Sequence, residues 1–191
     1  MGQGGLVRGR HMKSLLQAVA RLPPQDAERV RLKVQPATLA AIADATGIDW
    51  LPAELNLELT HAIHAGLGEE RFGGFFRDEL RSAFGGPLLR IVVDAALRVF
   101  HVDAAAFVGW LVKGWGLVFR GCGEWVVERA GDREAILRIE KLPPAFVDEV
   151  WLRSVAHSLD AIWDLARARG AFTLTSSDPP GGRATYRISW T

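Results

Sequence analysis

The sequence predicts an α+β fold, in which a helical N-terminal half is followed by a four-stranded antiparallel sheet with one long helix packed on it. Three observations predict it. Apolar residues recur at helical spacing through the first half, the apolar period changes from about 3.6 residues to 2 near residue 119, and one long amphipathic run separates two hairpin patterns. A chain of 191 residues can bury about two-thirds of its unfolded surface in one core.

Proline and glycine mark the ends of the expected N-terminal helices. Pro24, Pro36 and Pro52 stand at or near first turns, and Gly47 is a typical C-terminal stop. The expected helices cover residues 14–22, a short run from about 24, 36–46, 52–67, 71–84, 88–100 and 104–115. Residues 1–12 are glycine-rich and aperiodic, so we expect a flexible or tag-like N-terminus, then a helical segment over 13–47 and an α+β ligand- or partner-binding domain over 48–191.

The last third alternates in the manner of strands. Residues around Trp125 alternate between two faces as in a strand, and a turn is expected near residues 130–133. The return strand places Ala135, Leu137 and Ile139 on one face. Pro143 and Pro144 then end the hairpin and start the long helix, which is expected to stop near Gly170. A second hairpin closes on the strand 184–190. One face of the resulting sheet is expected to pack on the helix.

Composition and charge exclude several classes of function. The net charge of +1 supplies no long-range field for nucleic acid or an anionic membrane. The longest apolar run, residues 104–112, is far shorter than the ~20 residues that span a bilayer. A single cysteine, Cys122, fits a reducing compartment. We therefore expect a cytoplasmic protein without a membrane span and without nucleic-acid binding.

Three stretches of the chain resemble a known protein family. They are Leu-Pro-Pro-Ala-Phe-Val at 142–147, the helix end at 166–171 and the terminal Tyr186-Arg187-Ile188-Ser189-Trp190. They resemble an uncharacterised bacterial family, a domain of unknown function, from about residue 50 onward. More distantly, the layout resembles the superfamily of heme-nitric-oxide-binding domains, vinyl-reductase-type sensor domains and TRAPP trafficking subunits. That resemblance implies binding of heme, small apolar ligands, acyl chains or partner proteins.

Heme is the first chemistry that the resemblance implies. His101 follows the expected helix 88–100 in the region where heme-binding relatives place the proximal ligand, and a neutral imidazole among apolar helices can ligate iron. The relatives hold the heme propionates with a Tyr-x-Ser-x-Arg pattern. The nearest register here is Trp125, Val127 and Arg129, of which only the arginine matches. The alternative is that His101 caps a helix end, which is the more common role of a single histidine there.

Two further positions could carry chemistry. Glu54, Glu58 and His61 share one helix face and could ligate a metal, although a di-iron bundle needs a second Glu-x-x-His element that this chain lacks. A solvated helix face explains them as well. Cys122 stands between two glycines and could be an accessible thiol, and the TRAPP-type relatives imply acylation there. An apolar edge cysteine is the alternative.

The tryptophans give the leading hypothesis. The chain holds seven of them, and an indole offers a large apolar area with one donor that needs a partner. We expect a non-enzymatic binding or regulatory module, with an apolar pocket or protein-interaction face at the helix-sheet junction. The expected pocket residues are Phe100, Phe107, Trp110, Trp115, Trp125 and Trp151. No cofactor is expected. The alternatives are a heme- or metal-binding sensor or enzyme using His101 or Glu58 and His61, and a structural homodimer joined through Glu124, Glu128, Arg138 and Arg187.

Overall fold

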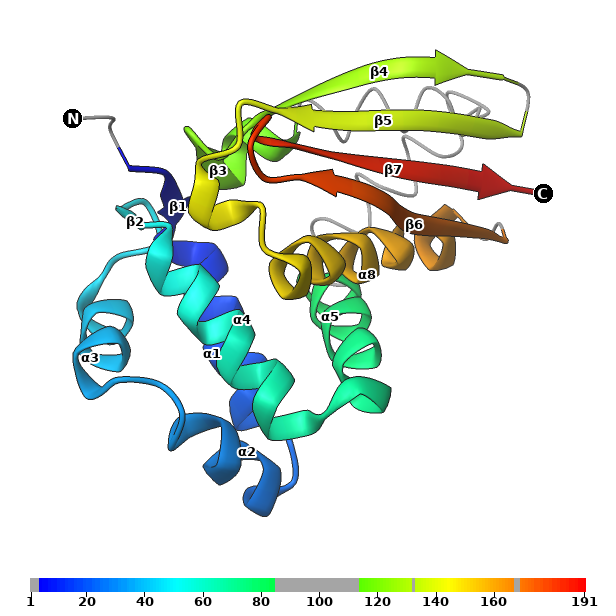
Figure 1. Ribbon diagram of the computed structural model, residues 1–191. Helices are drawn as coiled ribbons and strands as arrows, with labels where there is room; N and C mark the ends of the chain where they lie inside the picture. Colours follow the sequence, from blue (N-terminus) through cyan, green and yellow to red (C-terminus); the bar gives the residue numbers. More distant parts are fainter. Residues whose placement is uncertain (1–3, 85–113, 132, 167–168) are drawn as a thin grey trace.

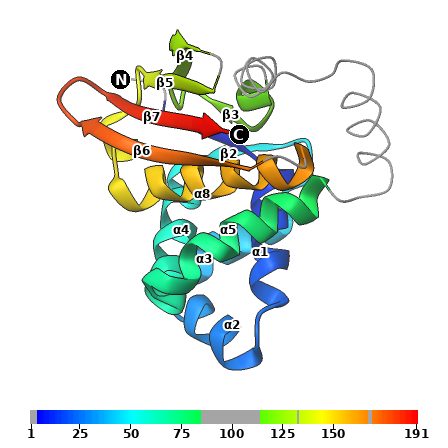
Figure 2. The ribbon, with the colours of Figure 1, turned by 90° about the vertical axis from the view of Figure 1, so that its right-hand side faces the viewer.

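A computed structural model describes residues 4–84, 114–131, 133–166 and 169–191 of the chain (Figure 1). It confirms the α+β class: a helical N-terminal half, a four-stranded antiparallel sheet, and a long helix packed on that sheet. In both views the sheet forms one layer and the N-terminal helices lie on the other side of the long helix (Figures 1 and 2). No helix in the described ranges is long and apolar enough to cross a membrane.

Residues 4–84 contain five helices. They are α1 (Gly9–Ala20), α2 (Pro24–Arg31), α3 (Pro36–Asp44), α4 (Glu54–Leu67) and α5 (Glu69–Phe84). Pro24 and Pro36 open α2 and α3 as predicted, because proline at the first helical position loses no hydrogen bond. On α5, Phe72, Phe75 and Phe76 are buried, at the spacing of one helical face. The predicted helix 88–100 and most of 104–115 lie outside the described residues, although residues 114–118 are helical.

The N-terminus is more ordered than its composition indicates. Residues 6–12, expected to be flexible or tag-like, form the strand β1 (Leu6–Arg8) and the first turn of α1. Val7 and Met12 are fully buried. The composition alone does not reveal this arrangement, because the apolar side chains in the glycine-rich run show no helical or strand period.

A small three-stranded sheet, which the sequence did not predict, holds β1 in place. Its order is β2–β1–β3, with β2 (Trp50–Pro52) and β3 (Phe119–Arg120) both antiparallel to β1. The register pairs Arg8 with Trp50 and Val7 with Phe119. Strands of two or three residues are too short for an alternating pattern to reveal them.

The four-stranded sheet has the order β4–β5–β7–β6, all antiparallel. Its strands are β4 (Glu124–Ala130), β5 (Glu134–Glu140), β6 (Gly170–Asp178) and β7 (Arg183–Trp190). Ala135, Leu137 and Ile139 are buried on the predicted inner face of β5, and Tyr186 and Ile188 lie beside them on β7. Both predicted hairpins are therefore present.

The long helix α8 (Glu149–Ala166) starts later than predicted. Pro144–Phe146 forms a separate 3-10 turn, and α8 begins after Asp148, whose Oδ1 accepts a hydrogen bond from the Trp151 backbone N–H at 2.8 Å. Asp148 is thus the helix cap, a role typical of aspartate. The helix is tied to the sheet by Tyr186, whose hydroxyl donates to the Leu152 carbonyl at 3.1 Å.

Candidate functional site

An aromatic cluster fills the junction between the helices and the sheets. Trp115 stacks at a tilt on Phe119 of β3, with ring centroids 4.4 Å apart. It also meets Trp125 of β4 edge-on at 5.6 Å and Trp151 of α8 at 6.0 Å. The cluster continues through Phe146, Phe172 and Tyr186, each with a ring centroid 5.0 to 5.3 Å from that of a neighbour. Edge-to-face packing at these separations stabilises each pair beyond the apolar area that it buries.

Polar contacts fix the deep part of the cluster. The Trp151 indole Nε1 donates to Asn56 Oδ1 of α4 at 2.8 Å, and both side chains are buried. Tyr186 is also fully buried, and burial raises its pKa well above its usual value, so the phenol stays protonated and donates to α8. The rings on the α8 side therefore have fixed orientations.

The Trp115 end of the cluster differs from the deep part. The ring is only partly buried, yet its Nε1 is enclosed and has no hydrogen-bond acceptor among the described residues. A buried donor without an acceptor costs about 1–3 kcal/mol. Trp163 Nε1 on α8 is also enclosed without an acceptor among the described residues, but its ring stacks on Trp190 and does not belong to this cluster. Trp115 is thus the place in the cluster where an added acceptor would bring the largest gain.

His11 completes this end of the cluster. It lies on α1 and meets Phe119 edge-on at 5.6 Å. Burial lowers the pKa of His11, and the nearby Glu79 carboxylate opposes part of that shift. The imidazole is therefore neutral at physiological pH. Sequence reasoning missed this residue because it set residues 1–12 aside, although the Leu-Val pair at residues 6 and 7 was a signal that the segment could pack.

The structure brings together three of the six expected pocket residues. Trp115, Trp125 and Trp151 belong to one cluster. Phe100, Phe107 and Trp110, like the proposed heme ligand His101, lie outside the described residues. Two surface depressions lie elsewhere, one beside Glu58 and His61 and one between Pro143 and Pro180.

The residues proposed for a metal are used in other contacts. Glu58 Oε1 accepts the Gln35 backbone N–H at 2.6 Å, and Oε2 accepts the Thr38 hydroxyl at 2.7 Å, so this carboxylate caps the start of α3 from α4. His61 Nε2 lies 3.0 Å from Asp148 Oδ1, the oxygen that caps α8. Within residues 4–84, 114–131, 133–166 and 169–191, no group of three His, Cys, Asp or Glu residues could hold a metal ion. Both side chains thus join helices.

Cys122 lies in the core, which matches the alternative of an apolar cysteine and not that of an accessible thiol. Its side chain is fully buried, with Sγ 3.5 Å from the Arg120 carbonyl, and a Cβ on Gly5 would lie 2.4 Å from that sulfur. Burial, reinforced by the Glu54 carboxylate, raises the pKa of Cys122 to about 12. A buried protonated thiol is a poor nucleophile. Of the two flanking glycines, Gly123 serves close packing, because a Cβ there would lie 2.4 Å from Ile139 Cγ2.

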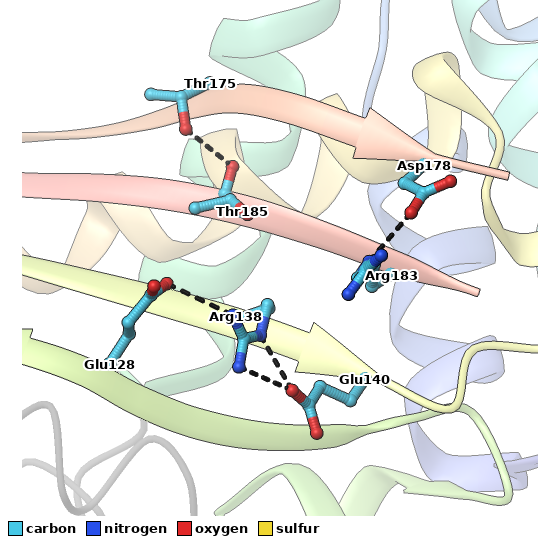
Figure 3. Close-up of polar contacts among 7 residues, drawn as sticks. All are labelled: Glu128, Arg138, Glu140, Thr175, Asp178, Arg183 and Thr185. Atoms are coloured by element: carbon cyan, nitrogen blue, oxygen red, sulfur yellow. Dashed lines mark hydrogen bonds and ion pairs between the residues drawn. The ribbon is translucent and has the colours of Figure 1, made fainter. Parts of the chain in front are cut away.

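The outer face of the four-stranded sheet pairs its charges internally. Arg138 lies between Glu140 and Glu128, at N to O distances of 2.7 and 3.5 Å, and Arg183 binds Asp178 at 2.7 Å (Figure 3). The Thr175 hydroxyl donates to the Thr185 carbonyl at 3.1 Å on the same face. Arg187 lies 4.0 Å from Glu134. Because these groups already have partners, the face supplies no specific support for a homodimer.

Comparison with known proteins shows the fold of the chain. No protein-family profile and no curated protein matches the sequence. Among solved structures, the Fe(II) unliganded H-NOX protein from K. algicida is similar with a TM-score of 0.59 and 11% identity, over 96% of each chain. An H-NOX mutant from T. Tengcongensis gives a TM-score of 0.53 at 9% identity, over 96% of this chain and 97% of that one. A structure described as probing heme distortion in the H-NOX family has a TM-score of 0.58 at 8% identity, over 96% of this chain and 95% of that one. The chain therefore has the fold of H-NOX domains, as the resemblance to heme-nitric-oxide-binding domains predicted, at very low sequence identity.

Proposed function

We propose that this chain is a non-enzymatic binding or regulatory module that holds a small apolar ligand at the Trp115 end of the aromatic cluster. The observation that carries the proposal is the state of Trp115: its indole N–H is enclosed and lacks an acceptor among the described residues, while the residue itself is only partly buried. A ligand with an apolar body and one acceptor would cover the ring and satisfy the donor.

The rest of the cluster suits a rigid wall for such a ligand. Phe119 and Trp151 contact the Trp115 ring from two sides, and Trp151 is itself fixed by Asn56. The neutral His11 adds a further polar group beside Phe119 without adding charge. A site with apolar walls and few polar groups is the common form of a small-molecule site.

The described residues do not fit a heme. At the two positions that the resemblance assigns to the propionate-binding hydroxyls, the chain carries Trp125 and Val127. The Trp125 ring is enclosed by Tyr186 and Phe172, and neither Trp125 nor Val127 offers a hydroxyl to an anionic group. We therefore rank an apolar ligand above heme, for which the support from the sequence is His101 and the matching Arg129.

A pair of tryptophan variants tests the proposal. Titration with anilinonaphthalene sulfonate, which has an aromatic body and sulfonate acceptors, is expected to give one saturable site. Trp115→Phe keeps the ring but removes the donor, so we expect binding at least about fivefold weaker. The control is Trp163→Phe, because Trp163 also has an enclosed N–H without an acceptor among the described residues but lies outside the cluster. The affinity of this variant for the dye should stay within about twofold of that of the native chain. Absence of saturable binding, or equal losses in both variants, would contradict the proposal.

A heme-binding sensor is the second candidate, because the similar solved structures are described as H-NOX proteins with Fe(II) and heme. The absorption spectrum of the purified protein, before and after addition of hemin, separates the two. A Soret band that disappears in His101→Ala would replace the apolar-ligand proposal with heme. A colourless protein that does not take up hemin, with an organic ligand retained in native mass spectrometry, would support the first candidate.

A further inference from the structure

The outer face of the small sheet gathers one tryptophan and two arginines. β1, β2 and β3 lie together at one end of the molecule (Figure 1). Arg8 is paired with Trp50, and Arg120 with Leu6, two residues before Arg8. Residues at alternate positions share a face, so these side chains lie opposite Val7 and Phe119, which face the core. Arg8, Trp50 and Arg120, with Ile48 and Leu117 beside them, are called the Arg-Trp surface below.

Two guanidinium groups share one indole. The Arg8 Cζ lies 3.8 Å and the Arg120 Cζ 4.0 Å from the centroid of the Trp50 ring. Each cation-π contact at a surface is favourable by about 0.5–1 kcal/mol, but two cations brought so close repel one another. In the described part of the chain, no carboxylate lies within ion-pair distance of either arginine. A bound anion would relieve this repulsion.

Exposed aliphatic side chains flank the two cations. Arg8 donates through one terminal nitrogen to the Ile48 carbonyl at 2.8 Å, and its Nε lies 3.4 Å from the Leu117 carbonyl. The side chains of Ile48 and Leu117 are 80% and 71% exposed, and they are two of the four large apolar side chains found exposed in the described ranges. The carboxylate of Asp49, between Ile48 and Trp50 in the sequence, accepts the Thr46 backbone N–H at 2.6 Å and forms no ion pair with Arg8 or Arg120 in the described part of the chain.

We propose that the Arg-Trp surface binds an acidic segment of a partner protein, with carboxylates on Arg8 and Arg120 and an apolar side chain between Ile48 and Leu117. Tryptophan and arginine are the residues most enriched where protein partners bind tightly. Two cations are too few for an anionic membrane, which is recognised by about four to eight basic residues. The net charge of +1 also argues against nucleic acid. This inference does not depend on the ligand proposed above.

The test uses a fluorescein-labelled peptide that alternates aspartate or glutamate with leucine and phenylalanine, followed by fluorescence anisotropy. The full chain is expected to bind it with a Kd between about 1 µM and 1 mM, and to lose that binding at high salt. The same peptide with asparagine and glutamine in place of the acids should not bind. Vesicles containing phosphatidylserine and a short DNA duplex are the competing probes.

The decisive comparison is between two double variants with matched changes. Arg120→Glu with Leu117→Asp alters the surface and should weaken peptide binding at least about tenfold. Arg31→Glu with Leu32→Asp makes the same chemical changes at the end of α2, where Leu32 is 79% exposed, and should change binding by less than about twofold. Ile48→Asp alone provides a second surface variant should the first fail to fold. The proposal is overturned if the native chain does not bind the peptide by about 1 mM, if both double variants bind alike, or if only vesicles or DNA bind in an Arg120-dependent way.

Discussion

The Trp151 indole of α8 donates a hydrogen bond to Asn56 Oδ1 of α4 at 2.8 Å, inside the core. This contact joins the helical half to the helix that carries the sheet. Replacing Asn56 with leucine leaves the Trp151 N–H buried without its acceptor, so the free energy of unfolding should fall by about 1–3 kcal/mol in urea denaturation. Adding Trp151→Phe removes the stranded donor, and the combined loss should be smaller than the sum of the single losses. Additive losses would show that the bond is not formed.

Close packing of α5 on α8 gives a second prediction, with two adjacent glycines as a matched pair. A Cβ on Gly73 would lie 2.9 Å from His157 Cε1, whereas a Cβ on Gly74 meets nothing within 4 Å. Gly73→Ala should therefore lower the free energy of unfolding by about 1–3 kcal/mol through overpacking. Gly74→Ala should raise it by up to about 1 kcal/mol, because alanine favours the helix. Thermal or urea unfolding measures both, and equal effects would contradict the predicted contact.

Burial of His157 predicts a pH dependence. The pKa of His157 is lowered by burial, against the opposing effect of Asp160 and together with that of Arg153. As the pH falls below about 6.5, the unfolded chain takes up this proton before the folded one, so stability decreases. In His157→Gln the fall in unfolding free energy between about pH 7.5 and 5.5 should be smaller than in the native chain.

Comparing how the unfolding free energy changes with pH in the two proteins separates the effect of His157 from that of other groups. His11 also has a pKa lowered by burial and adds a loss of the same sign in both proteins. Asp160 has a pKa raised by burial, so its protonation favours the folded state and acts in the opposite direction, at more acidic pH. Identical slopes for the native chain and His157→Gln would show that His157 does not titrate differently in the two states.

Cys122 should be unreactive in the folded protein. Its thiol is buried and its pKa is raised to about 12, so little thiolate exists near neutral pH. Reaction with Ellman's reagent should be on the order of a hundredfold slower in buffer than in urea, where the whole thiol is titrated. Rapid stoichiometric labelling of the native protein would show that the thiol is accessible. It would then support the acylation site that the TRAPP-type resemblance implied.

The cluster and the Arg-Trp surface differ in how far the sequence revealed them. The tryptophan content pointed to an aromatic interior, and Trp115, Trp125 and Trp151 do meet there. The Arg-Trp surface gave no sequence signal, because Arg8, Trp50 and Arg120 come from strands far apart in the chain that are too short to show a period. The structural roles of Asn56 and Glu58 were not predictable for a similar reason: each is a polar residue on a helix, and its role depends on a partner from another segment.

Local patterns in the sequence determined the α+β class, the prolines that open α2 and α3, and the inner face of β5, since helical and strand periods reflect burial within a single element. Tertiary structure alone decided that Val7 and Met12 belong to the core, that Cys122 is closed to solvent, and that Trp115 keeps an enclosed donor without an acceptor among the described residues. These properties depend on which distant segments come into contact. The periodicity of one element shows which side is buried, but it does not identify the residue that lies against that side.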